Sequence, residues 1–147
     1  MNRRFLSART KVACALLAAL VGVSGCGVKR IPTSGTITLD GKPMTLGVLQ
    51  FIPDASKGNK LRLASGGAIS NGRWNLATSG MERADTGGGA PVGWFKVIYI
   101  NPNEGSKGVA PGPTVADKFK QEQTTPISIE LTDPPPAEGY KIELTSK

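Results

Sequence analysis

Beyond residue 33 of this 147-residue chain, apolar and polar residues alternate in short runs, and Gly, Pro or Asn follows most of them. Successive side chains of a β-strand point to opposite faces of a sheet, so this period of two predicts strands with one buried face. The spacing of a long amphipathic helix does not occur in this region. The pattern therefore predicts an all-β fold of short strands and tight turns.

The runs predict about seven strands. They are expected over residues 36–39, 48–52, 61–70, 73–78, 93–100, 126–132 and 140–145. Asn71-Gly72 favours a type I′ hairpin turn, since both positions accept a positive φ at low cost. The glycine pair at 66–67 is expected to interrupt the third run, residues 79–91 and 101–114 are expected to be loops, and 115–123 to hold one or two helical turns. Short strands at this spacing predict a seven-stranded antiparallel β-sandwich.

The start of the chain has a different character. Its first positions carry four basic residues, Arg3, Arg4, Arg9 and Lys11, and the first acidic residue is Asp40. An uncharged apolar run follows over residues 12–22. As a helix this run would extend roughly 16 Å, about half of a ~30 Å hydrocarbon core. It is too short for a transmembrane helix but typical of a secretory signal peptide.

Val23, Ser24, Gly25 and Cys26 follow this run and resemble the lipobox of bacterial lipoproteins, an aliphatic residue and two small residues before a Cys. In such proteins the thiol receives a diacylglyceryl group, cleavage occurs before the Cys, and the new amino group is acylated with a chain such as palmitate. The resemblance implies a signal peptide over residues 1–25, a lipidated Cys26 with a tether over 26–33, and a domain over 34–147. Two or three acyl chains anchor a protein firmly without a membrane span. Gly27, in place of Asp, favours the outer membrane over the inner.

The net charge of +7 at first suggests a polyanion as partner. Removal of the four basic residues of the signal lowers it to +3 (7 minus 4), and the remaining basic residues are interleaved with acidic ones. A nucleic-acid partner is therefore not predicted. Lys29 and Arg30, just after the lipidated Cys, are either in contact with anionic headgroups or part of an ordinary solvated linker.

Catalysis and metal binding find little support in the sequence. The chain has no His, and its two Cys are Cys14, within the signal, and Cys26, capped by lipid. Ser-His-Asp and Cys-His catalysis are thereby excluded, and no spacing of carboxylates suggests a calcium loop or a glycosidase pair. No residue pattern points to a Ser-Lys arrangement. We predict no catalytic residues, no metal site and no cofactor besides the covalent lipid on Cys26.

The alternation also assigns faces to the strands. The parity expected of the core is shared by Ile37, Leu39, Leu49, Phe51, Trp74, Leu76, Phe95, Val97, Tyr99, Ile127, Ile129, Leu131, Ile142 and Leu144. On the central strand, Trp94, Ile98 and Ile100 then point the other way. This trio is either a ligand-binding face, since Trp is enriched at binding hot spots, or a surface covered by a loop or by the tether.

Several of these segments resemble a family of small bacterial lipoproteins, of planctomycete type, with a transthyretin-like or carboxypeptidase-regulatory-like domain. The opening motif at residues 34–44 (SGTITLDGKPM) carries most of the resemblance. Weaker similarity lies at 51–53, at 71–76 (NGRWNL), at 93–97 (GWFKV) and at 119–131. The resemblance implies a seven-stranded sandwich of transthyretin (prealbumin)-like type outside the cytoplasm. The family has no agreed catalytic residues, and the long 79–91 loop departs from its pattern.

These observations leave two functions of different class. The first is a lipid-anchored envelope lipoprotein whose sandwich is a non-catalytic module that binds an envelope protein or a glycan. The second is a purely structural envelope protein, and an enzyme is a distant third. The membrane is the only partner that the sequence identifies, through the lipid on Cys26.

Overall fold

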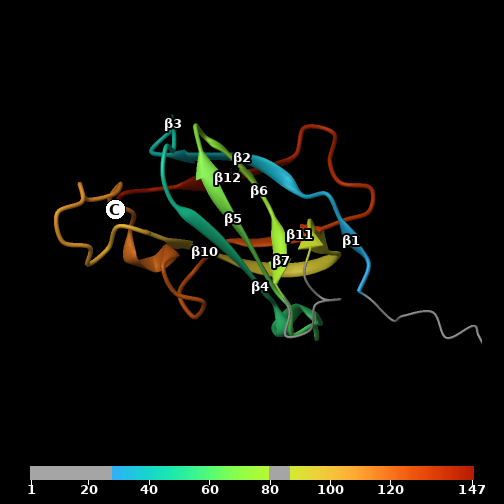
Figure 1. The fold of residues 1–147 in the computed structure, drawn as a ribbon. Helices are drawn as coiled ribbons and strands as arrows, with labels where there is room; N and C mark the ends of the chain where they lie inside the picture. The colour runs from blue at the N-terminus through green and yellow to red at the C-terminus, as the bar shows by residue number, and fades with distance from the viewer. Residues whose placement is uncertain (1–27, 80–86) are drawn as a thin grey trace, which may run out of the picture.

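The computed structural model describes residues 28–79 and 87–147 (Figure 1). Over these residues the protein is all-β, with two single turns of 3-10 helix as its described helical structure. None of the described helices is long and apolar enough to cross a membrane. The predicted signal peptide and the lipobox residues Val23, Ser24, Gly25 and Cys26 lie outside the described residues.

The structure has these elements in chain order. The strands are β1 (Arg30–Ile31), β2 (Ser34–Leu39), β3 (Lys42–Pro43), β4 (Val48–Pro53), β5 (Ala64–Ser70), β6 (Arg73–Asn75), β7 (Ala77–Ser79), β8 (Gly87–Gly88), β9 (Ala90–Pro91), β10 (Gly93–Ile100), β11 (Ser128–Leu131) and β12 (Tyr140–Leu144). The 3-10 turns are η1 (Ala55–Lys57) and η3 (Asp117–Phe119).

The strands form a curled, sandwich-like arrangement. Neighbouring strands follow the path β11-β10-β4-β5-β6-β2-β12. Most of β5 pairs with β4 and β7, but its last residues pair with β6. The sheet therefore folds over at β5, and β2, β6 and β12 lie across the core from β4, β10 and β11 (Figure 1).

Among the described strands, the pairing is antiparallel with one exception. β12 runs parallel to β2, with Tyr140 opposite Gly35 and Leu144 opposite Leu39. The prediction of a wholly antiparallel sandwich is wrong for this pair. The reason is topological: β2 and β12 are far apart in the chain, so no hairpin turn forces them to run in opposite directions.

The core confirms most of the predicted faces. Of the residues with core parity, Leu39, Ile127 and Ile129 are half-buried against the core and the others are buried. Phe51 lies between two other aromatic rings, 5.3 Å from Trp74 and 6.3 Å from Phe95 between centroids. The core also includes buried residues outside the parity set: Met44, Ile69, Ala90, Val115, Phe119 and Tyr140.

Three local predictions about strands need correction. The stretch 79–91, expected to be a loop, includes the short strands β8 and β9. Gly66 and Gly67 do not interrupt the third run, because β5 continues through both. Gly67 lies where the chain approaches β6 closely, and a Cβ there would collide with the backbone carbonyl of Asn75. The following run, predicted as a single strand, divides at Leu76 into β6 and β7, which pair with different ends of β5.

Candidate functional site

The central strand β10 runs between two ends of the molecule, and each end has a surface hollow. Its eight residues span about 26 Å. Trp94, Ile98 and Ile100 lie on its outer side, and their burial decreases along the strand, from half-buried to 40% exposed at Ile100. Lys96 lies between Trp94 and Ile98, and its amine donates to the carbonyl of Glu122 at 3.3 Å. Of the predicted trio, Trp94 lines one of the two hollows, and Ile98 and Ile100 line neither of them.

Trp94 lies in an open hollow, which we call the Trp94 hollow. Its volume is ≈ 550 Å³, and its walls are residues 28–29, 57–61 and 91–94. The Nζ of Lys57 lies 3.7 Å from the centroid of the Trp94 ring, a cation–π contact. The loop and the start of the described chain thus both adjoin Trp94. The sequence suggested that a loop or the tether covers Trp94; residues of both segments line the hollow, which remains open between them.

The loop that carries Lys57 is attached to the backbone of Trp94. The Trp94 carbonyl accepts from the amide of Asp54 at 2.9 Å and from Nδ2 of Asn59 at 2.8 Å. Gly58 ends η1 with a φ of 84°, a left-handed conformation that glycine adopts at low cost. These contacts fix the loop, and with it Lys57, beside the Trp94 ring.

The buried side chain of Asp54 also stabilises this loop. It is 3% exposed, and its carboxylate accepts from the amide and hydroxyl of Ser56, at 3.1 and 2.5 Å, and from the hydroxyl of Ser128 at 3.2 Å. The Ser56 hydroxyl contributes most to lowering the pKa of Asp54, burial opposes it, and the Ser128 bond lowers it further. Asp54 is the N-cap of η1, so its charge serves loop geometry.

A Ser-Lys arrangement does not form at this site. Ser128 and Lys96 lie opposite each other on β11 and β10. The Ser128 hydroxyl, however, donates to Asp54, and the Lys96 amine donates to a backbone carbonyl. The Ser128 hydroxyl and the Lys96 amine therefore each bond to a partner that stabilises the fold, and not to each other. Among the described residues, no three His, Cys, Asp or Glu side chains gather as metal ligands would.

Part of the predicted tether belongs to the folded domain. β1 pairs with β9, with Ile31 opposite Ala90, and Ile31 is 3% exposed. Thr33 is also buried, and its carbonyl accepts from the amide of Leu76 at 2.9 Å. The fold therefore includes residues 30–33, ahead of the boundary expected at residue 34. A strand of two residues has too short a pattern for sequence alternation to reveal.

Lys29 is neither free nor part of a plain linker. Its Nζ lies 2.6 Å from Oδ2 of Asp133, in the turn between β11 and β12. The hydrogen bond to this carboxylate raises the pKa of Lys29, and both side chains remain well exposed. An exposed pair of this kind contributes little to stability, so burial of Ile31 is the stronger attachment of this segment.

A second hollow, with a mixed polar and apolar lining, lies at the other end of β10; we call it the loop hollow. Its volume is ≈ 370 Å³, and its walls come from residues 101–115 and Lys120. Oδ1 of Asn101 accepts from the amide of Asn103 at 3.0 Å, and Nδ2 of Asn103 donates to the Ala110 carbonyl at 3.0 Å. Lys120 bonds to Asp117 at 2.9 Å, and this hydrogen bond raises its pKa.

The sequence pattern identified Trp94 but not the residues that surround it. Lys57, Lys60 and Leu61 belong to a polar loop more than thirty positions earlier, and no local signal connects that loop to Trp94. Only the pairing of β4 with β10 brings the two together, since β4 leads directly into the loop. The one sequence feature that could have suggested this surface is the presence of two lysines near Leu61 in that loop.

The fold defines the class of this protein: a small all-β domain with curled, mainly antiparallel sheets. No family model matches the chain, and neither a curated protein nor a solved structure matches it significantly. The likeness to transthyretin-like lipoproteins thus remains a prediction from the sequence motifs.

Proposed function

We propose that this protein is a lipid-anchored lipoprotein of the cell envelope, held preferentially on the outer membrane. Its transthyretin-like β-sandwich would be a non-catalytic module that binds an envelope protein or a glycan. The proposal rests first on the sequence, through the signal-like segment and the lipobox ending at Cys26. No cofactor other than the covalent lipid is required, and nucleic acid is not a partner.

One structural observation supports this function above others: the domain has two distinct ends. Pairing of β1 with β9 places Val28, two positions after Cys26, beside Trp94. The loop hollow lies at the far end of β10 (Figure 1). An anchor on Cys26 would hold the first end at the membrane and leave the second end directed away from it.

The chemistry of the loop hollow fits a polar partner. Amide groups of Asn101 and Asn103, the carboxylate of Glu104 and the hydroxyl of Ser106 line it together with Lys120. Amides, hydroxyls and single charges are the groups that recognise sugar hydroxyls or peptide backbone. Val109, 52% exposed, adds an apolar contact at the rim.

Lipidation is the first test of this proposal. Mass spectrometry of protein extracted from membranes should identify an N-terminal Cys26 that carries acyl groups. The Cys26→Ala variant should accumulate as the uncleaved precursor. A mature protein that begins at another residue and is soluble without detergent would overturn the anchor.

Binding is tested at the loop hollow. A photo-crosslinking residue at Ser106 should capture one specific envelope component in intact cells, and the same residue at Ala137, in the turn between β11 and β12, serves as the matched control. Capture from position 106 alone supports the binding module. Failure at both positions favours the purely structural role, and turnover of an envelope substrate by the purified protein would indicate an enzyme.

A further inference from the structure

Basic and apolar side chains are combined around the Trp94 hollow. Lys57 and Lys60 line it, the exposed Arg62 follows the lining residue Leu61 in the chain, and Leu61, Val92 and Trp94 supply its apolar surface. We propose that this set, the Trp94 face, docks on the surface of a membrane that contains anionic phospholipid. The inference rests on the proposed lipid anchor and goes beyond it, because it gives the folded domain its own contact with lipid.

The anchor geometry brings this face to the membrane. The fold begins no later than Arg30, where β1 pairs with β9, so Arg30 lies only four residues beyond the lipidated Cys26. Four residues extend at most about 14 Å. Val28 and Lys29, the last residues of this connection, line the Trp94 hollow itself. The domain therefore cannot move far from the bilayer, and the Trp94 face adjoins its point of attachment.

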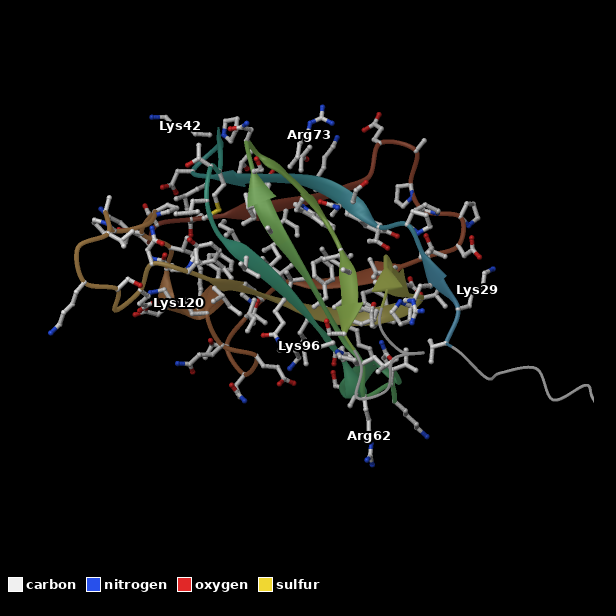
Figure 2. All side chains as sticks on the ribbon, in the orientation of Figure 1. Lys29, Lys42, Arg62, Arg73, Lys96 and Lys120 are labelled. Carbon is white, nitrogen blue, oxygen red and sulfur yellow. The ribbon has the colours of Figure 1, made fainter. Side chains whose placement is uncertain are left out.

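The charge of the face suits phosphate headgroups. Lys57, Lys60 and Arg62 are exposed, and none of them forms an ion pair with another described residue. Among the described residues, the nearby Asp54 is buried with its carboxylate bonded to two serines, Asp133 is paired with Lys29 at the wall of the hollow, and Glu130 lies opposite Trp94 on β11. Figure 2 shows Arg62 at the lower end of the molecule and Lys42 and Arg73 at the upper end.

The apolar part of the face suits the boundary between headgroups and acyl chains. Val92 is 47% exposed, and Trp94 and Leu61 are half-buried at the walls of the hollow. Indole rings favour this boundary because they combine a large apolar area with an N–H donor. Basic residues near an anionic surface each add to binding, and long lysine side chains extend to the phosphates. Because the hollow is open to solvent, it fits a membrane surface better than a small anion.

The test uses the acylated mature protein reconstituted in vesicles of phosphatidylcholine, with or without phosphatidylglycerol. Lipids brominated near the headgroup end of their chains quench tryptophan at the membrane boundary. The chain has two Trp, and Trp74 is 2% exposed in the core, so quenching reports on Trp94. We expect strong quenching with phosphatidylglycerol, little without it, and none in Trp94→Phe.

Charge variants test the face directly. In Lys57→Glu with Lys60→Glu, the ratio of docked to undocked protein should fall at least about tenfold. The matched control, Lys42→Glu with Arg73→Glu at the other end, should retain the wild-type ratio. High salt should weaken docking of the wild type, since exposed charges are screened. Near-ultraviolet circular dichroism verifies that every variant is folded.

The possible failures are distinguishable. An unacylated Cys26 in the mass spectrum would overturn the proposed anchor. Acylated protein whose Trp94 is unquenched on anionic vesicles, or is quenched equally on neutral ones, would overturn only the docking face. Equal losses in the two double variants would also overturn it, because the effect would then follow net charge and not this surface.

Discussion

Asp54 shows how a single residue prepares the Trp94 hollow. Its buried carboxylate caps η1 and bonds to Ser128 on β11, and its backbone amide donates to the carbonyl of Trp94. One residue thereby links the loop bearing Lys57 to two strands. A buried carboxylate with all of its bonds made is stable, but the same group without them would cost folding energy.

The Asp54→Ala substitution should destabilise the protein by about 1–2 kcal/mol at pH 7, since it removes a helix cap and two hydroxyl partners. The pKa of Asp54 is lower in the folded state, so its stabilisation is fully present above the unfolded pKa of about 3.9. It is lost as the pH falls through the folded value. Urea unfolding at pH 7 and at pH 3 should therefore show a smaller difference between wild type and variant at pH 3.

Asp117→Ala provides the control for this measurement, because Asp117 is exposed and its ion pair with Lys120 lies at the surface. Its unfolding midpoint should change little at neutral pH. If Asp54→Ala lowers the free energy of unfolding by the same amount at pH 7 and at pH 3, the charge of the Asp54 carboxylate contributes nothing to stability.

At the scale of elements, the shortest strands have a large effect on the placement of the chain. β1 and β9 contribute two residues each, yet their pairing fixes where the N-terminal segment leaves the domain. Gly89 permits this approach with a φ of 83°, and a Cβ there would collide with the carbonyl of Ile31. The position of the proposed anchor relative to Trp94 follows from this contact.

Ile31→Ala should lower the free energy of unfolding by about 2–4 kcal/mol, because it empties a buried site. It should also free the N-terminal segment, which trypsin would then cleave faster at Lys29 and Arg30. Pro32→Ala is the neighbouring control at an exposed position, with an expected change within about 0.5 kcal/mol. Cleavage at an unchanged rate in Ile31→Ala would show that β1 is not held by this side chain.

At the scale of the molecule, the sandwich is completed by its last strand. β12 adds Tyr140, Ile142 and Leu144 to the core and pairs with β2, the first long strand. The Tyr140 hydroxyl also accepts from the amide of Thr132 at 3.0 Å. Gly35 on β2 leaves the space for this approach, because a Cβ there would collide with the Tyr140 carbonyl.

A chain that ends at Gly139 should therefore lose cooperative unfolding, measured by circular dichroism during a urea titration. One face of the core would be open, and β2 would have an unpaired edge. A chain that ends at Thr145 is the control, since it keeps β12 and the bond from the Ala116 amide to the Thr145 carbonyl. Cooperative unfolding of the shorter chain would show that β12 is dispensable.

Much of the local structure was predictable from the sequence. The strand over residues 93–100 has the predicted bounds, and Asn71 and Gly72 have the positive φ values, 50° and 73°, of the predicted turn. The loop expected over 101–114 contains no strand or helix. These features depend on neighbouring residues, whose turn propensity and alternation act within a few positions.

Other features had no local signal. Met44 and Phe119 are buried although they lie outside the predicted strands. Met44 follows β3 and its amide donates to the carbonyl of Ile37, and Phe119 is the buried residue of η3. The glycine pair in β5 suggested that the strand is interrupted there. Instead, Asn75 approaches so closely that position 67 requires a residue without a side chain. Such contacts depend on residues distant in the chain.

The sequence by itself determined the all-β class, the main strands, their turns and their buried faces, because alternation and turn chemistry are local properties. It also carries the lipobox-like and signal-like segments on which the proposed anchor depends. Only the tertiary structure decided that β12 runs parallel to β2, that β1 joins the fold, and that lysines of a distant loop surround Trp94. These outcomes follow from which strands pair, and pairing is set by packing of the whole core.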